Sequence, residues 1–310
     1  MTTRSSFVAV NGAWAGLGNR IRFTLSAEAI AAAEGRDFAY IWPTSPGLFE
    51  PALTDLWDYP APRLPWGSVV PTMTEHRAHL SRRRSLTDMR AAKKWVVLGS
   101  SVLHGDGREQ SWETHLPNLA PVPAIRDRVA LTRSQLPENY VGVQVRAAPT
   151  THPTTLEASP VSWFIARMVE LAREDPQTHF FLSCDDPAAE RQIGEAVPNV
   201  TTLPAKGAYN TVTGVQAAVA DLYLLGGSTH LLGPYLSSFV ELAWILGGKA
   251  QVLENSVHRF GPGTALHRHQ PIDLGFRPPA SELYVRNPLL VAWDRFAARH
   301  AHAANTSTTS

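Results

Sequence analysis

The sequence predicts an α/β protein with two Rossmann-like halves that face each other across a cleft, and two patterns support this. Near the N-terminus a strand, a glycine turn, a helix and a second strand follow one another, which is typical of parallel pairing with helices packed on a sheet. In the second half, strands and helices alternate four times, the pattern of a doubly wound parallel sheet. A helix joins the halves, so we expect an N-terminal domain over 1–135 and a C-terminal domain over 136–310.

The N-terminal unit begins with a short apolar strand over 7–10 and a turn over 11–18. From Ile21 the chain is rich in helix formers, and Gly35 is placed to end that helix as a C′ residue. A second strand is expected over 37–42. Together these elements form a βαβ unit.

Residues 43–120 are less regular, because prolines break the first part into short pieces. The composition of 76–94 favours a helix, 95–98 form a candidate buried strand, and 99–121 resemble a loop. We expect this region to be the elaborated part of the first domain, with loops that face a substrate.

The second half begins with a helix over 124–136. Ser159 and Asp186, each followed by proline, are candidate N-caps of later helices. A C-terminal helix over 289–302 precedes a polar tail, about 303–310, that we expect to be disordered. Between the first and the last of these helices we expect strands over 140–145, 178–182, 200–203, 230–232 and 251–253. The expected helices of this region lie over about 159–173, 186–197, 212–225 and 238–246.

Composition excludes several classes of protein. The chain has 310 residues, 44% of them hydrophobic, so it can bury a substantial core. Its formal net charge of +1 argues against a protein that coats nucleic acid or an anionic membrane. The single cysteine, Cys184, excludes a disulfide framework and Cys-clustered metal sites. Apolar runs are too short for a signal peptide or a membrane helix, so we expect a cytoplasmic protein.

The first candidate site is the glycine turn, Gly16 and Gly18 with Asn19 and Arg20. Glycines let the backbone approach a ligand closely, and the following helix offers N–H groups to an anion. Asn19 and Arg20 could both point polar groups into the cleft. The dinucleotide fingerprint wants a third glycine where Ile21 stands, which weakens an NAD-binding interpretation. The alternative is a tight turn that needs glycine only for its shape.

Two further candidates follow strands of the second half, where ligands of open α/β sheets bind. Arg146, with Gln144 before it, leaves the first of these strands and could hold a phosphate by a bidentate pair; the alternative is a surface arginine. Asp185 follows the next strand and could accept from the N–H edge of a purine. Asp186 is a good N-cap, although two adjacent acids could instead hold a divalent metal.

The last candidate is the pair Ser237 and Ser238, which follows a strand and opens a helix before Phe239. Their hydroxyls and the free N–H groups of the first turn could hold a pyrophosphate. The alternative is an ordinary capping box between Ser238 and Glu241. The twelve histidines form no convincing set of metal ligands.

In this order, these segments resemble the GDP-fucose-dependent fucosyltransferase superfamily, which includes the α-1,6-, α-1,2- and protein O-fucosyltransferases. The turn from Gly16 to Arg20 resembles its N-terminal G-x-G-N-[RQ] segment. Residues 141–146, VGVQVR, resemble its first donor motif, H-x-R-x-x-D, and residues 181–186, FLSCDD, resemble its second, an apolar strand that runs into T/S-D-D. The third motif is matched by Ala220–Asp221–Leu222 with Ser237–Ser238–Phe239 and Ala243.

The resemblance implies a GT-B fold, a donor site mainly in the C-terminal domain, no obligatory metal and no cofactor besides the GDP-sugar donor. It implies that Arg146 holds the β-phosphate and offsets charge on the departing GDP, and that Asp185 recognises the guanine. It also implies that Ser237, Ser238 and Phe239 hold the phosphate and the base. Asn19 and the glycine loop would line the cleft near the donor phosphates and the acceptor.

The chain departs from the first motif at two positions. The motif histidine is Gln144 here, and the motif acid is Pro149. The missing acid could loosen the support of Arg146, accompany a changed donor sugar, or accompany a lost activity.

These observations predict an inverting, metal-independent glycosyltransferase that moves a sugar, fucose or related, from a GDP-sugar to a hydroxyl of a small molecule, glycan or peptide. His152, Glu157 and Asp106 are loop candidates for the catalytic base. Two alternatives stay open: a catalytically inactive nucleotide-sugar-binding protein, favoured by Gln144 and Pro149, and a dinucleotide-dependent oxidoreductase, favoured by the glycine turn.

Overall fold

The computed structural model describes residues 5–13, 15–68, 78–79, 90, 92–105, 107–149, 151, 153–235 and 237–262. These form two compact units, Met1–Arg128 with Ala205–Ala220, and Val129–Pro204 with Asp221–Ser310. The segment Ala205–Ala220 returns to the first unit, where Gln216 Nε2 donates to the carbonyl of Asp55 at 2.9 Å. Sequence periodicity does not reveal this return, because the flanking strand–helix alternation continues through it.

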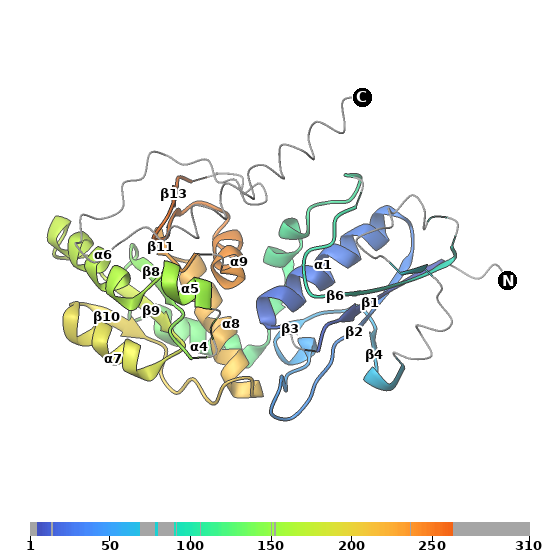
Figure 1. Ribbon diagram of the computed structural model, residues 1–310, viewed down its shortest axis with the longest axis horizontal. Coiled ribbons are helices and arrows are strands. Elements are labelled where there is room, and N and C mark those ends of the chain that lie inside the picture. The colour runs from blue at the N-terminus through green and yellow to red at the C-terminus, as the bar shows by residue number, and fades with distance from the viewer. Residues whose placement is uncertain are drawn as a thin grey trace. The chain divides into compact units, whose positions relative to one another are not determined.

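The first unit contains a parallel sheet in the order β4-β2-β1-β6-β5, of which Figure 1 labels the first four strands. Helix α1, Leu17–Ala33, connects β1 to β2 and packs against both. The predicted βαβ unit is therefore confirmed. The strands are β1 Ser6–Asn11, β2 Asp37–Ile41, β4 Arg63–Leu64, β5 Ala78–His79 and β6 Lys94–Gly99.

The ends of α1 follow from glycine. Gly16 is the N-cap in extended conformation, so the helix begins at Leu17 rather than at Ile21, and the expected turn is shorter than predicted. At the other end Gly35 has a φ of +61°, and Arg36 N donates to the carbonyl of Ala31. This is the glycine-terminated helix end that the sequence predicts.

The rest of the first unit consists of short elements. The helix predicted over 76–94 is wrong at Ala78–His79, which form β5 and pair with Trp95 and Val96. Pairing with a buried strand overrides local helix propensity there. Residues 76, 77, 80–89 and 91 of this predicted helix lie outside the described residues. The other elements are η1 Leu53–Asp55, β3 Trp57–Asp58, η2 Trp66–Ser68, η3 Trp112–Thr114, η4 Leu116–Asn118 and β7 Ala120–Pro121, with β3 and β7 paired antiparallel.

The second unit contains a sheet in the order β10-β9-β8-β11-β12-β13, parallel except for the β12–β13 pair. All five predicted strands are present, and the antiparallel edge strand β13 is additional. Strand order runs from β8 outward in both directions, so the topological switch point lies between β8 and β11. The strands are β8 Val141–Val145, β9 Phe180–Cys184, β10 Val200–Thr202, β11 His230–Leu232, β12 Val252–Glu254 and β13 Arg259–Phe260.

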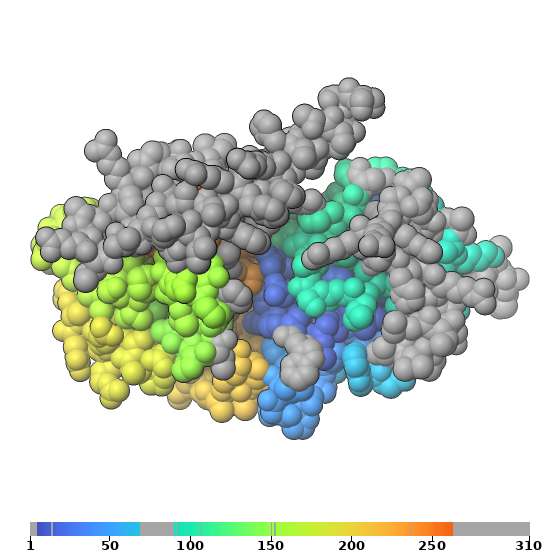
Figure 2. Space-filling view, viewed as in Figure 1, coloured from blue at the N-terminus to red at the C-terminus, as the bar shows by residue number. Residues whose placement is uncertain are grey.

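The predicted helices of the second half are present, with one difference in capping. Pro160, not Ser159, is the N-cap of α6. The short helix α5 is additional; α5 and α7 lie at the surface in Figure 2. None of the described helices is long and apolar enough to cross a bilayer. The predicted helix over 289–302 and tail over 303–310 lie outside the described residues. The helices are α4 Pro123–Arg133, α5 Pro153–Ala158, α6 Val161–Glu174, α7 Pro187–Ala196, α8 Val212–Gly226 and α9 Ser238–Leu246.

The core of the second unit lies between β8, β9 and the helices α6 and α7. Every residue of β8 and β9 is buried, as expected for strands of a parallel sheet covered by helices. Trp163 and Phe164 of α6 are in edge-to-face contact, with ring centroids 4.8 Å apart. Full burial of side chains of this size contributes roughly 1.5–3 kcal/mol each, so this layer holds the strand ends in place.

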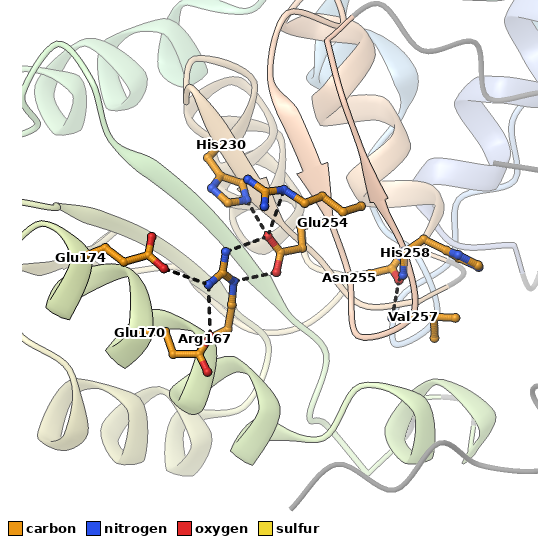
Figure 3. Close-up of polar contacts among 9 residues, drawn as sticks. Arg167, Glu170, Glu174, His230, Glu254, Asn255, Val257 and His258 are labelled. Atoms are coloured by element: carbon orange, nitrogen blue, oxygen red, sulfur yellow. Dashed lines mark hydrogen bonds and ion pairs between the residues drawn. The ribbon is translucent and has the colours of Figure 1, made fainter. Parts of the chain in front are cut away.

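A buried charge cluster joins α6 to the sheet (Figure 3). Glu254 of β12 is fully buried, and its carboxylate accepts from Arg167 Nε at 2.7 Å and contacts His230 Nε2 at 3.0 Å. Arg167 also contacts Glu170 at 3.1 Å. Burial alone would raise the pKa of Glu254, but the hydrogen bonds from His230 and Arg167 outweigh it and lower that pKa below its ordinary value. The Glu254 carbonyl accepts from Gly233 N at 2.9 Å, so the cluster also anchors the loop after β11.

We expect Glu254→Gln to lower the free energy of unfolding by about 3 kcal/mol, because Arg167 then lacks its buried counter-charge. Since the folded-state pKa of Glu254 is depressed, its contribution is present above the ordinary value of 4.5 and is lost as pH falls below it. Chemical denaturation of both proteins across this pH range should therefore show a difference that shrinks on acidification. Glu174→Gln is the control, because that carboxylate is 68% exposed and 3.8 Å from Arg167. Equal losses in both variants would contradict the prediction.

Candidate functional site

The candidate site lies in the second unit, at the carboxyl ends of β8, β9 and β11. The two loops that leave β8 and β11 flank the switch point. A hydrogen bond joins the end of β8 to the loop after β11: Ser237 Oγ donates to Gln144 Oε1 at 3.2 Å. Gln144 is buried and pairs in register with Ser183 of β9. Residues that are 93 positions apart in sequence thus form one polar group where ligands of doubly wound sheets bind.

Arg146 and Asp185 meet at this edge. The Nε atom of Arg146 lies 2.8 Å from Asp185 Oδ2, and the two side chains are 34% and 20% exposed. The other carboxylate oxygen, Oδ1, accepts from the backbone N–H groups of Ala147 and Ala148 at 2.7 and 3.0 Å. Within the described part of the chain, the terminal nitrogens of Arg146 have no hydrogen bond or ion pair. The Arg146 side chain is one-third exposed, so among the described residues its terminal nitrogens remain available for a ligand.

Ser237 opens helix α9. Its Oγ accepts from Val240 N at 3.4 Å, so Ser237 is the N-cap and Ser238 is the first helical residue. The capping box predicted between Ser238 and Glu241 is wrong by one residue, because the extended conformation that a cap requires falls on Ser237. Ser238 and Phe239 are half-buried in the first turn. First-turn N–H groups have no partner inside a helix, which favours an anion there.

The loop between β11 and α9 is held from a second side by Ser159. This buried hydroxyl accepts from Tyr235 N at 2.8 Å and lies 3.4 Å from Ser256 Oγ. The sequence predicts Ser159 as a helix cap; the structure instead uses it to fix the loop that leads to Ser237.

One buried carboxylate near the site belongs to the segment that resembles the third motif, but the sequence alone indicated no role for it. Asp221 of α8 is 3% exposed, and Ser183 Oγ donates to its Oδ2 at 2.7 Å. The available signal was a single acid in an otherwise apolar helical run, AVADLYLL. Such a residue is buried only when hydrogen bonds compensate for lost hydration.

The two adjacent aspartates have separate partners. Asp186 is the N-cap of α7 and accepts from Ala189 N at 2.8 Å, as the sequence predicts. Asp185 instead contacts the loop after β8. Among the described residues, no three His, Cys, Asp or Glu side chains lie close enough together to hold a metal ion.

The glycine turn belongs to the first unit. Gly16 is exposed, and a Cβ atom added there would meet no atom within 4 Å, so the turn has room beside it. Gly18, Asn19 and Arg20 lie inside the first turns of α1. Asn19 is half-buried, and its Oδ1 accepts from Arg22 Nη2 at 2.6 Å.

Arg20 does not occupy the ligand-facing position that the sequence predicts. It is 0% exposed, and its guanidinium donates to the carbonyls of Ala15, Pro43 and Ala13 at 2.6, 2.6 and 2.8 Å. The guanidinium carbon lies 4.3 Å from the ring centroid of Phe49. Burial lowers the pKa of Arg20 to about 10, so it stays protonated at neutral pH. Carbonyl dipoles and an aromatic face compensate for its burial, which makes it a structural residue of the turn.

We expect Arg20→Ala to lower the free energy of unfolding by about 2–4 kcal/mol, because it removes three hydrogen bonds of a buried side chain and leaves a cavity. Arg22→Ala is the matched control, because Arg22 lies on the same helix two positions later, is only half-buried and contacts Asn19. Urea denaturation of both variants measures the difference. A stable Arg20→Ala protein with only weakened ligand binding would instead support the role predicted from sequence.

The candidate bases are less constrained. Glu157 is exposed on α5, which follows the Arg146 loop. His152 and Asp106 lie outside the described residues.

Neither the protein-family models nor the curated proteins contain a match to this sequence. Solved structures do match. Fucosyltransferase NodZ from Bradyrhizobium is similar with a TM-score of 0.55 and 19% identity, over 79% of this chain and 94% of that chain. A mutant of FUT1 from Arabidopsis thaliana in complex with GDP gives 0.56 and 13%, over 84% and 72%. POFUT1 in complex with GDP gives 0.55 and 12%, over 81% and 96%. The mixed α/β fold with parallel sheets is therefore the fold of these fucosyltransferases, in agreement with the resemblance seen in the sequence.

Proposed function

We propose that the protein is a glycosyltransferase that moves a sugar, fucose or a related one, from a GDP-linked donor to a hydroxyl group of an acceptor. In this proposal the two units form a GT-B arrangement of Rossmann-like domains that face each other across a cleft. The observation that carries it is Arg146 at the carboxyl end of β8, next to the switch point of the second sheet, with terminal nitrogens that pair with no described residue. The shared fold with structures solved with GDP supports the choice of nucleotide.

The donor diphosphate is expected to lie between Arg146 and α9. The two terminal nitrogens of a guanidinium match two phosphate oxygens in geometry, and the positive end of a helix adds further N–H donors. Ser237 and Ser238 stand at that helix end, and Gln144 holds Ser237 in place. Phe239, half-buried in the same turn, is our candidate for contact with the nucleobase.

The proposed reaction inverts the anomeric carbon. The acceptor oxygen forms a bond to that carbon while the bond to the donor phosphate breaks, and the electron pair of the broken bond leaves on GDP. The acceptor proton passes to a base, for which Glu157 is the described candidate. Negative charge develops on the leaving diphosphate, so Arg146 and the start of α9 stabilise the transition state more than the ground state. Asn19 and Gly16 would line the acceptor side.

We expect Arg146→Ala to reduce sugar transfer by a factor of about 100 or more, because removal of one preorganised donor to a developing anion has effects of that size. The fold should persist, since Arg146 is one-third exposed and its only described ion pair is with Asp185. The measurement is release of GDP from GDP-fucose, together with the thermal midpoint of each protein. Arg191→Ala, an exposed arginine of α7, is the control. Full activity of Arg146→Ala would overturn the proposal.

A second candidate function is a binding protein without transferase activity, because Gln144 and Pro149 stand where the resembled motif has histidine and an acid. A thermal-shift and calorimetry panel of GDP, UDP, ADP, their sugars and NAD separates the possibilities. We expect stabilisation by GDP and GDP-sugars, with turnover on at least one acceptor of a broad hydroxyl panel. GDP binding without turnover would favour the second candidate, and stabilisation by NAD alone would favour an oxidoreductase.

A further inference from the structure

We infer that Asp185 is a positioning residue for Arg146 rather than a group that recognises the nucleobase. Its functional consequence, weaker binding of the donor diphosphate when Asp185 is replaced, rests on the proposed function. The contact itself is a property of the structure.

One carboxylate holds the end of β8 at three points. Oδ2 lies 2.8 Å from Arg146 Nε, and Oδ1 accepts from the N–H groups of Ala147 and Ala148. The side chain and the two residues that follow it are therefore held by the same group. Asp185 directly follows the adjacent strand β9, whose last two residues pair in register with Gln144 and Val145. The rigid sheet fixes the distance between the two partners.

The geometry of this pair concerns Nε of Arg146 and does not use the two terminal nitrogens of its guanidinium. A guanidinium has one edge formed by Nε and a terminal nitrogen, and another formed by the two terminal nitrogens. Asp185 contacts Nε, and no other described residue pairs with the second edge, which can therefore make a bidentate contact with phosphate. Because the carboxylate restrains a long side chain beforehand, less conformational entropy is lost when the diphosphate binds.

The same contacts argue against base recognition by Asp185. Its Oδ1 already accepts from two backbone N–H groups of the loop after β8, and its Oδ2 forms an ion pair with Arg146. A guanine edge would have to compete for them and would release Arg146 at the same time.

A double-mutant cycle on GDP affinity tests the inference, because residues that act through one another show non-additive effects. Calorimetry would compare the wild type with Asp185→Asn, Arg146→Ala and the double variant. We expect Asp185→Asn to weaken GDP binding roughly tenfold in the wild-type background and to have no further effect when Arg146 is absent. Equal losses in both backgrounds would overturn the inference and support recognition of the base. Asp186→Asn is the matched control: it makes the same change on the adjacent residue, and asparagine also caps helices well.

A spectroscopic readout separates this inference from the proposed function. In protein labelled with ¹⁵N-arginine, the Nε–H signal of Arg146 is identified by its loss in Arg146→Lys. We expect Asp185→Asn to shift that signal and Asp186→Asn to leave it unchanged, and an unchanged signal in Asp185→Asn would overturn the inference. If the wild type binds no GDP and Asp185→Asn still shifts the signal, the proposed function is refuted while the Asp185–Arg146 pair stands. Thermal midpoints confirm that each variant is folded.

Discussion

The reversal of strand order between β8 and β11 is the constraint on which the candidate site depends. At this point successive connections leave the sheet in opposite directions, so the carboxyl ends of two neighbouring central strands are left uncovered. Gln144 and Ser237 reach each other there, and Arg146 leaves the sheet beside them. The buried apolar layer of β8, β9, α6 and α7 holds these strand ends rigidly, which a site on loops alone could not achieve.

Three arginines of this chain show how environment decides what a cation can do. Arg20 is fully buried among backbone carbonyls and aromatic rings, and Arg167 is buried against Glu254, so both stabilise the fold. Arg146 is one-third exposed and held by a single carboxylate, Asp185, on one side. Only this last arrangement combines a restrained guanidinium with an open edge, which is what recognition of a phosphate requires. Residue type alone does not distinguish the three.

Local sequence signals predicted the elements whose causes are local. Apolar runs predicted the central strands, Gly35 predicted the end of α1, and Asp186 before proline predicted the start of α7. Prediction was wrong where a distant partner decides. Ala78–His79 form a strand because β6 offers a free edge, and Ser159 bonds to Tyr235 instead of capping α6.

By itself the sequence determined the α/β class, the order of the central strands and main helices, and the chain positions at which polar residues follow strands. These depend on hydrophobic periodicity and on turn and capping residues, which act over a few positions. Only the tertiary structure decided the roles of the charged residues: Arg20 inside the first unit, and Asp185 against Arg146 at the end of the second sheet. A charge is stabilised by whatever lies within a few ångströms of it, and those neighbours come from parts of the chain that sequence spacing does not relate.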